Sequence, residues 1–268
     1  MESPPEGIEA VEVYNLYYSG CTLAKHLSWW QAGEAHYDLF MVDKEGRKQL
    51  GDKQGWSLEA ALAQGNWDYL SIQGASGTIS TGDPAVTAAS TIEKMRPLME
   101  RFHAQFPDTQ LLYHRTWASE IGRVSGDITF TEEIQVQYDY NMHYVCEKVC
   151  EAYADIGLTM VNSGTAWRIA RELNAALPES LIPYGGLCAR LGYSKHGDLR
   201  AHSGDGYHDG DIGGAQLLNA YMWYMTITGD RDLSDSTYAP VYKYSGKEYP
   251  LSAEFIALLK QAAEQAWQ

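Results

Sequence analysis

The sequence predicts an α/β fold, a three-layer sandwich built around a mostly parallel sheet. Short runs rich in β-branched and aromatic residues alternate with helix-length segments, at the spacing of βαβ units. The run 67–73 is mostly apolar throughout, which is typical of a strand buried on both faces of a parallel sheet. The 268 residues, 45% of them hydrophobic, are enough for one large core, so we expect a single domain over 1–268.

The first half of the chain contains three predicted strands. The run 11–18 ends at a Ser-Gly pair, and Thr22 is a candidate N-cap for a helix or ordered loop after it. The remaining elements are an exposed polar hairpin over 42–55, a short helix over 58–65, a strand over 67–73, a helix over 92–106 with apolar residues at helical spacing, and a strand over 109–117.

The second half continues the alternation of predicted strands and helices as far as residue 177, and a loop-rich segment then interrupts it. We expect a long helix over 134–157, a strand over 158–163, and helices over 165–177, 214–229 and 252–267. Residues 176–204 are loop-rich, and the Tyr-rich segment 238–249 suits a hairpin at the sheet edge or a lid. Residues 1–10 are expected to form an irregular tail, and 230–268 to hold the Tyr-rich segment and the final helix.

The net charge and the composition limit the kinds of partner that we expect the protein to bind. The formal net charge of −15 repels phosphate backbones and anionic lipids, so we expect no nucleic acid and no membrane as partner. There is neither a membrane-length apolar run nor a signal-peptide pattern, which indicates a cytoplasmic protein. The 19 Tyr and 8 Trp suit either a carbohydrate-facing cleft or the rim of the core. The sequence leaves open whether the protein is a homo-oligomer.

The four cysteines do not resemble a metal site. Cys146 and Cys150 share a helix face, but no two further ligands follow at short spacing. We therefore interpret Cys21, Cys146, Cys150 and Cys188 as free thiols, and expect no cofactor and no metal.

Polar side chains gather where the predicted strands end, and ligands of open α/β sheets bind at that edge. Candidate substrate-binding residues there are Ser76, His114, Trp117 and Tyr207. The segment DGYHDGD places Asp205 three residues before His208. The carboxylate can accept the Nδ1 proton of the imidazole and so leave Nε2 as a general base.

Several blocks together resemble the SGNH (GDSL-type) esterases and lipases, in particular a bacterial branch of them. These blocks are NLYYSGCTLAKH, WDYLSIQGASG, HRTWA and DGYHDGD followed by a GGAQLLNAYMWY helix, and they extend over roughly residues 11–229. The resemblance implies a flavodoxin-like sheet and hydrolysis of an ester, such as an acetyl ester on a carbohydrate. It also implies His208 and Asp205 as catalytic residues, with the Gly20 amide and the Gln73 side chain as oxyanion donors.

One block of that family is absent from this sequence. Its enzymes begin with a central strand that ends in Gly-Asp-Ser or Gly-Asn-Ser and carries the nucleophile, whereas the run 11–18 is the first strand here. Three hypotheses about function follow. The protein is an esterase whose serine block is missing from this chain, a ligand- or glycan-binding homologue without turnover, or a metal-dependent hydrolase that uses residues 202–211. Cys21, Ser76 and Ser80 are weaker candidates for a replacement nucleophile.

Overall fold

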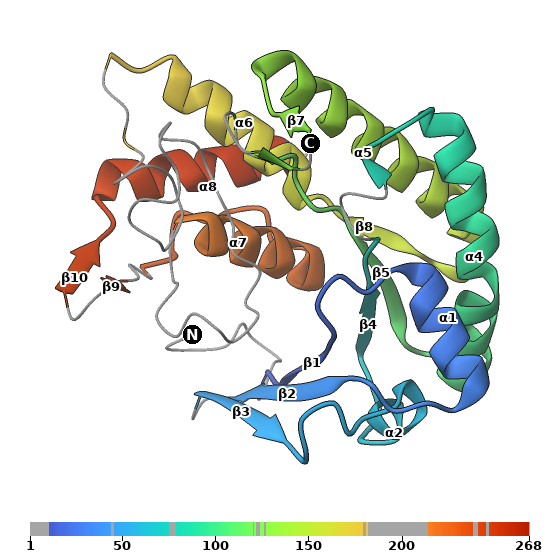
Figure 1. Ribbon diagram of the computed structural model, residues 1–268. Coiled ribbons are helices and arrows are strands. Elements are labelled where there is room, and N and C mark those ends of the chain that lie inside the picture. The colour runs from blue at the N-terminus through green and yellow to red at the C-terminus, as the bar shows by residue number, and fades with distance from the viewer. Residues whose placement is uncertain are drawn as a thin grey trace.

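A three-stranded parallel sheet confirms the α/β class (Figure 1). The computed structural model describes residues 11–43, 46–74, 79–119, 121, 124–125, 127–178, 181, 214–237, 241–244 and 247–267. The sheet has the order β4-β5-β8. Its strands are β4 (Tyr69–Ile72), β5 (Gln110–His114) and β8 (Thr159–Val161).

In the described part of the chain, three further sheets are antiparallel. The largest, β1-β2-β3, comprises β1 (Val13–Tyr17), β2 (Asp38–Asp43) and β3 (Gly46–Leu50), so the segment expected as a polar hairpin contains the end of β2 and all of β3, which pair antiparallel. The two small hairpins are β6 (Val124–Ser125) with β7 (Ile128–Thr129), and β9 (Val241–Tyr244) with β10 (Lys247–Pro250). The described part of the Tyr-rich segment therefore pairs as a hairpin, but it forms a two-stranded sheet of its own rather than extending the edge of the parallel sheet.

Long helices make the crossovers that parallel strands require. Helix α4 (Pro84–Gln105) joins β4 to β5, and α5 (Glu132–Ala152) lies between β5 and β8. Helix α4 begins eight residues before the expected 92, because Asp83 caps it by accepting from the Ala85 amide and Pro84 suits the first turn. The other helices are α1 (Leu23–Ala32), α2 (Leu58–Leu62), α6 (Ser163–Ala175), α7 (Gly214–Thr228), α8 (Ala253–Trp267) and the 3₁₀ turn η1 (Ala154–Ile156).

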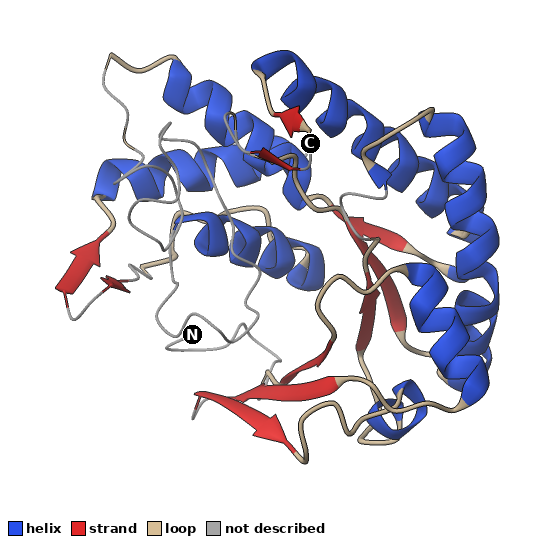
Figure 2. Cartoon of the chain, viewed as in Figure 1, coloured by secondary structure: helices blue, strands red, loops and turns tan. Residues whose placement is uncertain are grey.

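Alternate residues of β5 belong to two different apolar clusters. Leu112 packs with buried residues of α6, α7 and α8, whereas Leu111 and Tyr113 pack with buried residues of α4 and α5. Figure 2 shows helices on both sides of the parallel sheet. Burial of alternate residues on opposite faces is what the two-residue period of a strand produces.

Strand β4 is less buried than its apolar sequence predicts. Tyr69 and Ser71 are exposed, and Leu70 and Ile72 are only half-buried. The expectation of burial on both faces was therefore wrong for this strand. The helices α6 to α8 cover residues of β5 and β8, and no β4 residue belongs to their cluster.

Strand β4 also lies at an edge. Within the described ranges it pairs with β5 alone, and β1 pairs with β2 rather than with β4. An edge-on ring contact joins Tyr14 of β1 to Trp67, two residues before β4, with centroids 5.1 Å apart. Gln73, directly after β4, is exposed, and this is where the candidate site begins.

Candidate active site

Three residues form a continuous hydrogen-bonded chain across the carboxyl edge of the parallel sheet. Gln73 directly follows β4, His114 ends β5, and Ser163 begins α6 two residues after β8. Gln73 Oε1 lies 3.0 Å from His114 Nδ1, and His114 Nε2 lies 3.0 Å from Ser163 Oγ. Because β4, β5 and β8 are neighbours in the sheet, the chain connects the ends of all three strands.

The three members of this chain differ in their exposure. Ser163 is fully buried, His114 is 9% exposed, and Gln73 is exposed. Burial lowers the pKa of His114 from 6.5 to about 4, so its imidazole is neutral at pH 7. A neutral imidazole donates from one nitrogen and accepts at the other. Since the Gln73 carbonyl oxygen can only accept, Nδ1 carries the proton and Nε2 accepts from the Ser163 hydroxyl.

The oxygen and the nitrogen of the Gln73 amide differ in their hydrogen bonding. Its oxygen accepts from His114, whereas its Nε2 has no hydrogen-bond partner among the described residues. Two N–H donors are thus present on an exposed side chain at the sheet edge. Such donors can stabilise negative charge that develops on a carbonyl oxygen.

Two tryptophans lie beside the imidazole, and a third packs behind one of them. The Trp117 and Trp223 rings lie 6.2 and 5.2 Å from that of His114, and both side chains are half-buried. Trp117 also stacks on the buried ring of Trp167 at 4.5 Å, and Trp167 Nε1 donates to Asn219 of α7. These rings exclude water from His114 and hold α7 beside the site, with edges available for an apolar or sugar ring.

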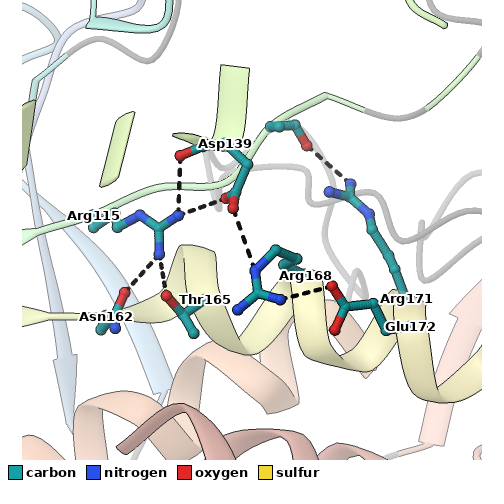
Figure 3. A network of polar contacts seen from close by, with 8 residues as sticks. Arg115, Asp139, Asn162, Thr165, Arg168, Arg171 and Glu172 are labelled. Atoms are coloured by element: carbon teal, nitrogen blue, oxygen red, sulfur yellow. Dashed lines mark hydrogen bonds and ion pairs between the residues drawn. The ribbon is translucent and has the colours of Figure 1, made fainter. Parts of the chain in front are cut away.

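A buried arginine fixes the turn that carries Ser163 (Figure 3). Arg115 is 1% exposed, and its guanidinium donates to Asn162 Oδ1 at 2.8 Å, to Thr165 Oγ1, and to Asp139 Oδ1 at 2.6 Å. Its backbone amide donates to Val161, and its carbonyl accepts from Gly164. Burial lowers the pKa of this guanidinium, and the Asp139 carboxylate opposes that shift. One side chain therefore ties β5 to α5 and to the first turn of α6.

Gly164 is required at this turn by close approach of the backbone. A Cβ at this position lies 2.4 Å from the Thr116 carbonyl oxygen and 2.9 Å from the Arg115 guanidinium. Any larger residue therefore pushes α6 away from β5 and separates Ser163 from His114.

The comparisons with known proteins concern the fold and the family. A protein-family model described as a domain of unknown function (DUF4886) matches residues 3–180. The chain belongs to the DUF4886 family. A crystal structure of a DUF4886 family protein from Bacteroides uniformis ATCC 8492 is similar, with a TM-score of 0.66 and 20% identity over 96% of this chain and 83% of that one. At this identity the likeness shows a shared fold. No curated protein matches.

The DUF4886 match covers Gly20, Gln73, His114 and Trp117, and a hydrogen bond and a ring contact connect the last three. Gly20 has φ +64° and lies on an exposed turn after β1, in the antiparallel sheet. No hydrogen bond among the described residues joins it to Gln73 or His114, so its role as a second oxyanion donor stays a prediction. The predicted residues Ser76, Asp205, Tyr207 and His208, and the metal-binding alternative at 202–211, lie outside the described residues.

Sequence reasoning about this DUF4886 chain missed Ser163, Arg115 and Trp223 as members of the site. Ser163 was visible as a residue at a strand end, but nothing in the sequence indicated that it faces His114. In the part of the chain that the structure describes, no cluster of three His, Cys, Asp or Glu side chains could hold a metal ion. No described helix has the length and apolarity needed to cross a membrane.

The surroundings of Cys21 keep its thiol protonated and do not activate it as a nucleophile. Burial raises its pKa to about 11, more strongly than Lys25 and the hydrogen bond with Tyr37 lower it. The Tyr37 hydroxyl lies 2.7 Å from Nδ1 of His26, whose pKa burial lowers to about 4. A protonated thiol is a poor nucleophile, so this arrangement disfavours Cys21 as a replacement for serine.

We expect the three described cysteines of this DUF4886 protein to be unreactive in the folded state. Burial raises the pKa of Cys146 and of Cys150 to about 12 each, so at pH 8 thiolate fractions are about 10⁻³ or lower. In a Cys188→Ser variant, a thiol-disulfide reagent at pH 8 should modify the folded protein at least about 100-fold more slowly than the unfolded chain. Rapid labelling of one thiol in the folded protein contradicts these pKa values.

Proposed function

We propose that this protein hydrolyses an ester at the carboxyl edge of the β4-β5-β8 sheet. The observation that carries the proposal is the Gln73 amide, exposed at the end of β4 and anchored through its oxygen to a neutral, buried His114. This geometry leaves the Nε2 donors to face an acyl oxygen. Helices on both sides of the sheet support a flavodoxin-like three-layer arrangement, in which ligands bind beyond this edge.

The proposed chemistry needs a base and a nucleophile besides the amide. The sequence offers Asp205 and His208, with the carboxylate orienting the imidazole. His208 takes the proton of the attacking hydroxyl, which belongs to a serine or to water, and returns it to the leaving alkoxide. Gln73 Nε2 donates to the oxyanion of the tetrahedral intermediate and so stabilises it. Carbohydrate acetyl esters are the proposed substrate class, because Trp117 and Trp223 flank His114.

Hydrolysis of p-nitrophenyl acetate tests this function. We expect His208→Ala to abolish turnover above buffer, and Gln73→Ala to lower kcat by about 10²-fold, the usual loss for one oxyanion donor. Gln64→Ala is the matched control, because Gln64 is exposed at the end of α2 and only bonds its own helix. A fluorophosphonate that inactivates the enzyme identifies a serine nucleophile, and inertness to it points to water.

Two outcomes contradict the proposed hydrolysis or its mechanism. Full activity in His208→Ala rules out the Asp205–His208 mechanism. A wild-type protein without turnover on aryl acetates or acetylated sugars, but with measurable binding of glycans, indicates a binding protein instead.

A further inference from the structure

We propose that Trp117 and Trp223 form a donor subsite beside Gln73, in which their two indole N–H groups bind the hydroxyl and ring oxygens of an acetylated sugar. The inference deepens the proposed function and rests on it for its catalytic meaning. Its ligand-binding part can be tested without turnover, because a sugar can bind to the two indoles whether or not an ester is cleaved.

The two indole nitrogens differ in their hydrogen bonding from most others in the protein. Within the described ranges, neither Trp117 Nε1 nor Trp223 Nε1 donates to another residue. Four other tryptophans donate from Nε1 to an oxygen of the protein at 2.6 to 2.9 Å: Trp30, Trp56, Trp67 and Trp167. An indole nitrogen donates and never accepts. The two indoles beside His114 therefore keep a donor that the fold itself does not use.

Both of these N–H groups reach solvent. The side chains of Trp117 and Trp223 are half-buried. Five described side chains hold a fully buried nitrogen or oxygen without a partner, and neither tryptophan is one of them. An N–H group that is neither buried nor bonded to the protein is hydrated, and a ligand oxygen can take the place of that water.

Contacts with the rest of the fold fix where the two indoles lie. The rings of Trp117 and Trp223 lie 6.2 and 5.2 Å from that of His114. Trp117 stacks on Trp167, whose Nε1 donates to Asn219 of α7. Asn219 lies four residues before Trp223, and residues four apart lie on the same side of a helix. Two rings that are already held in place lose little conformational freedom when a ligand binds.

The proposed acyl site lies beside the same imidazole. The Gln73 side chain is exposed and lies 3.0 Å from His114 Nδ1, so the amide and the two indoles are gathered around one buried ring. A ligand that satisfies the indole donors has to supply acceptor oxygens together with an apolar face for the rings. Simple alkyl esters lack the additional oxygens, whereas the hydroxyl groups and the ring oxygen of a sugar supply them.

The charges of the protein favour a neutral ligand here. The formal net charge of −15 disfavours the approach of anions. Arg115, next to His114 in the chain, is 1% exposed and paired with Asp139, so its charge is not available to a ligand. A sugar combines neutral oxygens with an apolar ring face, and an indole suits both. The acyl group at Gln73 and the sugar ring at the two indoles then belong to one acetylated carbohydrate.

Nitrogen-15 NMR of the indole N–H groups tests the donors on the intact protein, with signals assigned by their absence in Trp→Phe variants. Without ligand, the indole protons of Trp117 and Trp223 should exchange with water at least about tenfold faster than those of the four bonded tryptophans. N-acetylglucosamine is the probe, because its amide replaces the ester and is not consumed. It should shift the Trp117 and Trp223 signals and leave that of Trp29, in a separate ring cluster with Tyr18 and His36, in place.

A second ligand separates hydrogen bonding from apolar contact. N-cyclohexylacetamide carries the same acetamide on a ring without oxygens, and it should bind at least about tenfold more weakly because the indole donors stay unpaired. Trp117→Phe and Trp223→Phe keep an aromatic ring but remove the N–H group. Each should weaken the binding of N-acetylglucosamine by about 3- to 10-fold in titration calorimetry. Trp29→Phe is the matched control and should leave the affinity unchanged.

Three results overturn the subsite: no saturable binding of N-acetylglucosamine, equal affinity for N-cyclohexylacetamide, or unchanged affinity in both Phe variants. The last of these indicates that the rings only pack against His114. The hydrolase fails separately. Sugar binding that depends on the two indoles, in a protein without turnover, leaves the subsite standing and overturns hydrolysis, whereas turnover of p-nitrophenyl acetate without sugar binding does the reverse. If a variant does not fold, the two ligands compared on the wild type still decide the subsite.

Discussion

Replacing Arg115 by Met is expected to lower the free energy of unfolding by about 3–5 kcal/mol, the usual loss when one partner of a buried ion pair is removed. The Asp139 side chain is 12% exposed, and without Arg115 its remaining ion pair among the described residues is with Arg168, whose Nε lies 3.5 Å away. Asn162 and Thr165 also lose the donor that they share. Urea unfolding followed by circular dichroism measures the change.

A double-variant cycle separates the pair from its surroundings. Arg115→Met/Asp139→Leu should lose less than the sum of the two single changes, because the uncompensated charge is gone. Arg101→Met is the matched control: its pair with Glu59 has an N–O distance of 3.4 Å and side chains 45% and 43% exposed, so we expect less than about 1 kcal/mol. Equal losses in Arg115→Met and Arg101→Met contradict the role assigned to the buried guanidinium.

The protein should lose stability steeply between about pH 6.5 and pH 4. Burial lowers the pKa of both His26 and His114 from 6.5 to about 4. The unfolded chain therefore binds protons in this window that the folded protein does not. The stability is complete above the unfolded pKa, falls as the pH drops through the window, and levels off below the folded pKa. Each residue contributes on the order of 3 kcal/mol to this loss.

Urea unfolding at several pH values measures the slope. His26→Gln should remove the part of the loss that His26 contributes without touching the Gln73–His114–Ser163 chain, because His26 lies in the separate cluster with Tyr37. His103→Gln, at an exposed position of α4, should leave the slope unchanged. A pH dependence in His26→Gln identical to that of the wild type contradicts the neutral, buried state of His26.

Part of the candidate site could be predicted from the sequence. Gln73, His114 and Trp117 were expected together because each lies toward the carboxyl end of a predicted strand, and carboxyl ends of parallel strands share one edge. The structure brings these three residues close to one another. Ser163 and Trp223 were missed for different reasons. Ser163 follows a strand, but the side to which its hydroxyl points depends on the turn that Arg115 holds. Trp223 lies more than 100 residues from His114, and a helical pattern does not indicate which distant element it faces.

By itself, the amino-acid sequence determined the α/β class, the crossover helices and the edge of the sheet at which polar groups gather. These features follow from local periods, caps and strand ends, which each segment carries in its own residues. Only the tertiary structure decided that β4 is half-exposed, that Arg115 is buried, and that His114 stays neutral between Gln73 and Ser163. Exposure and protonation depend on what packs against a side chain, and those neighbours come from distant parts of the chain.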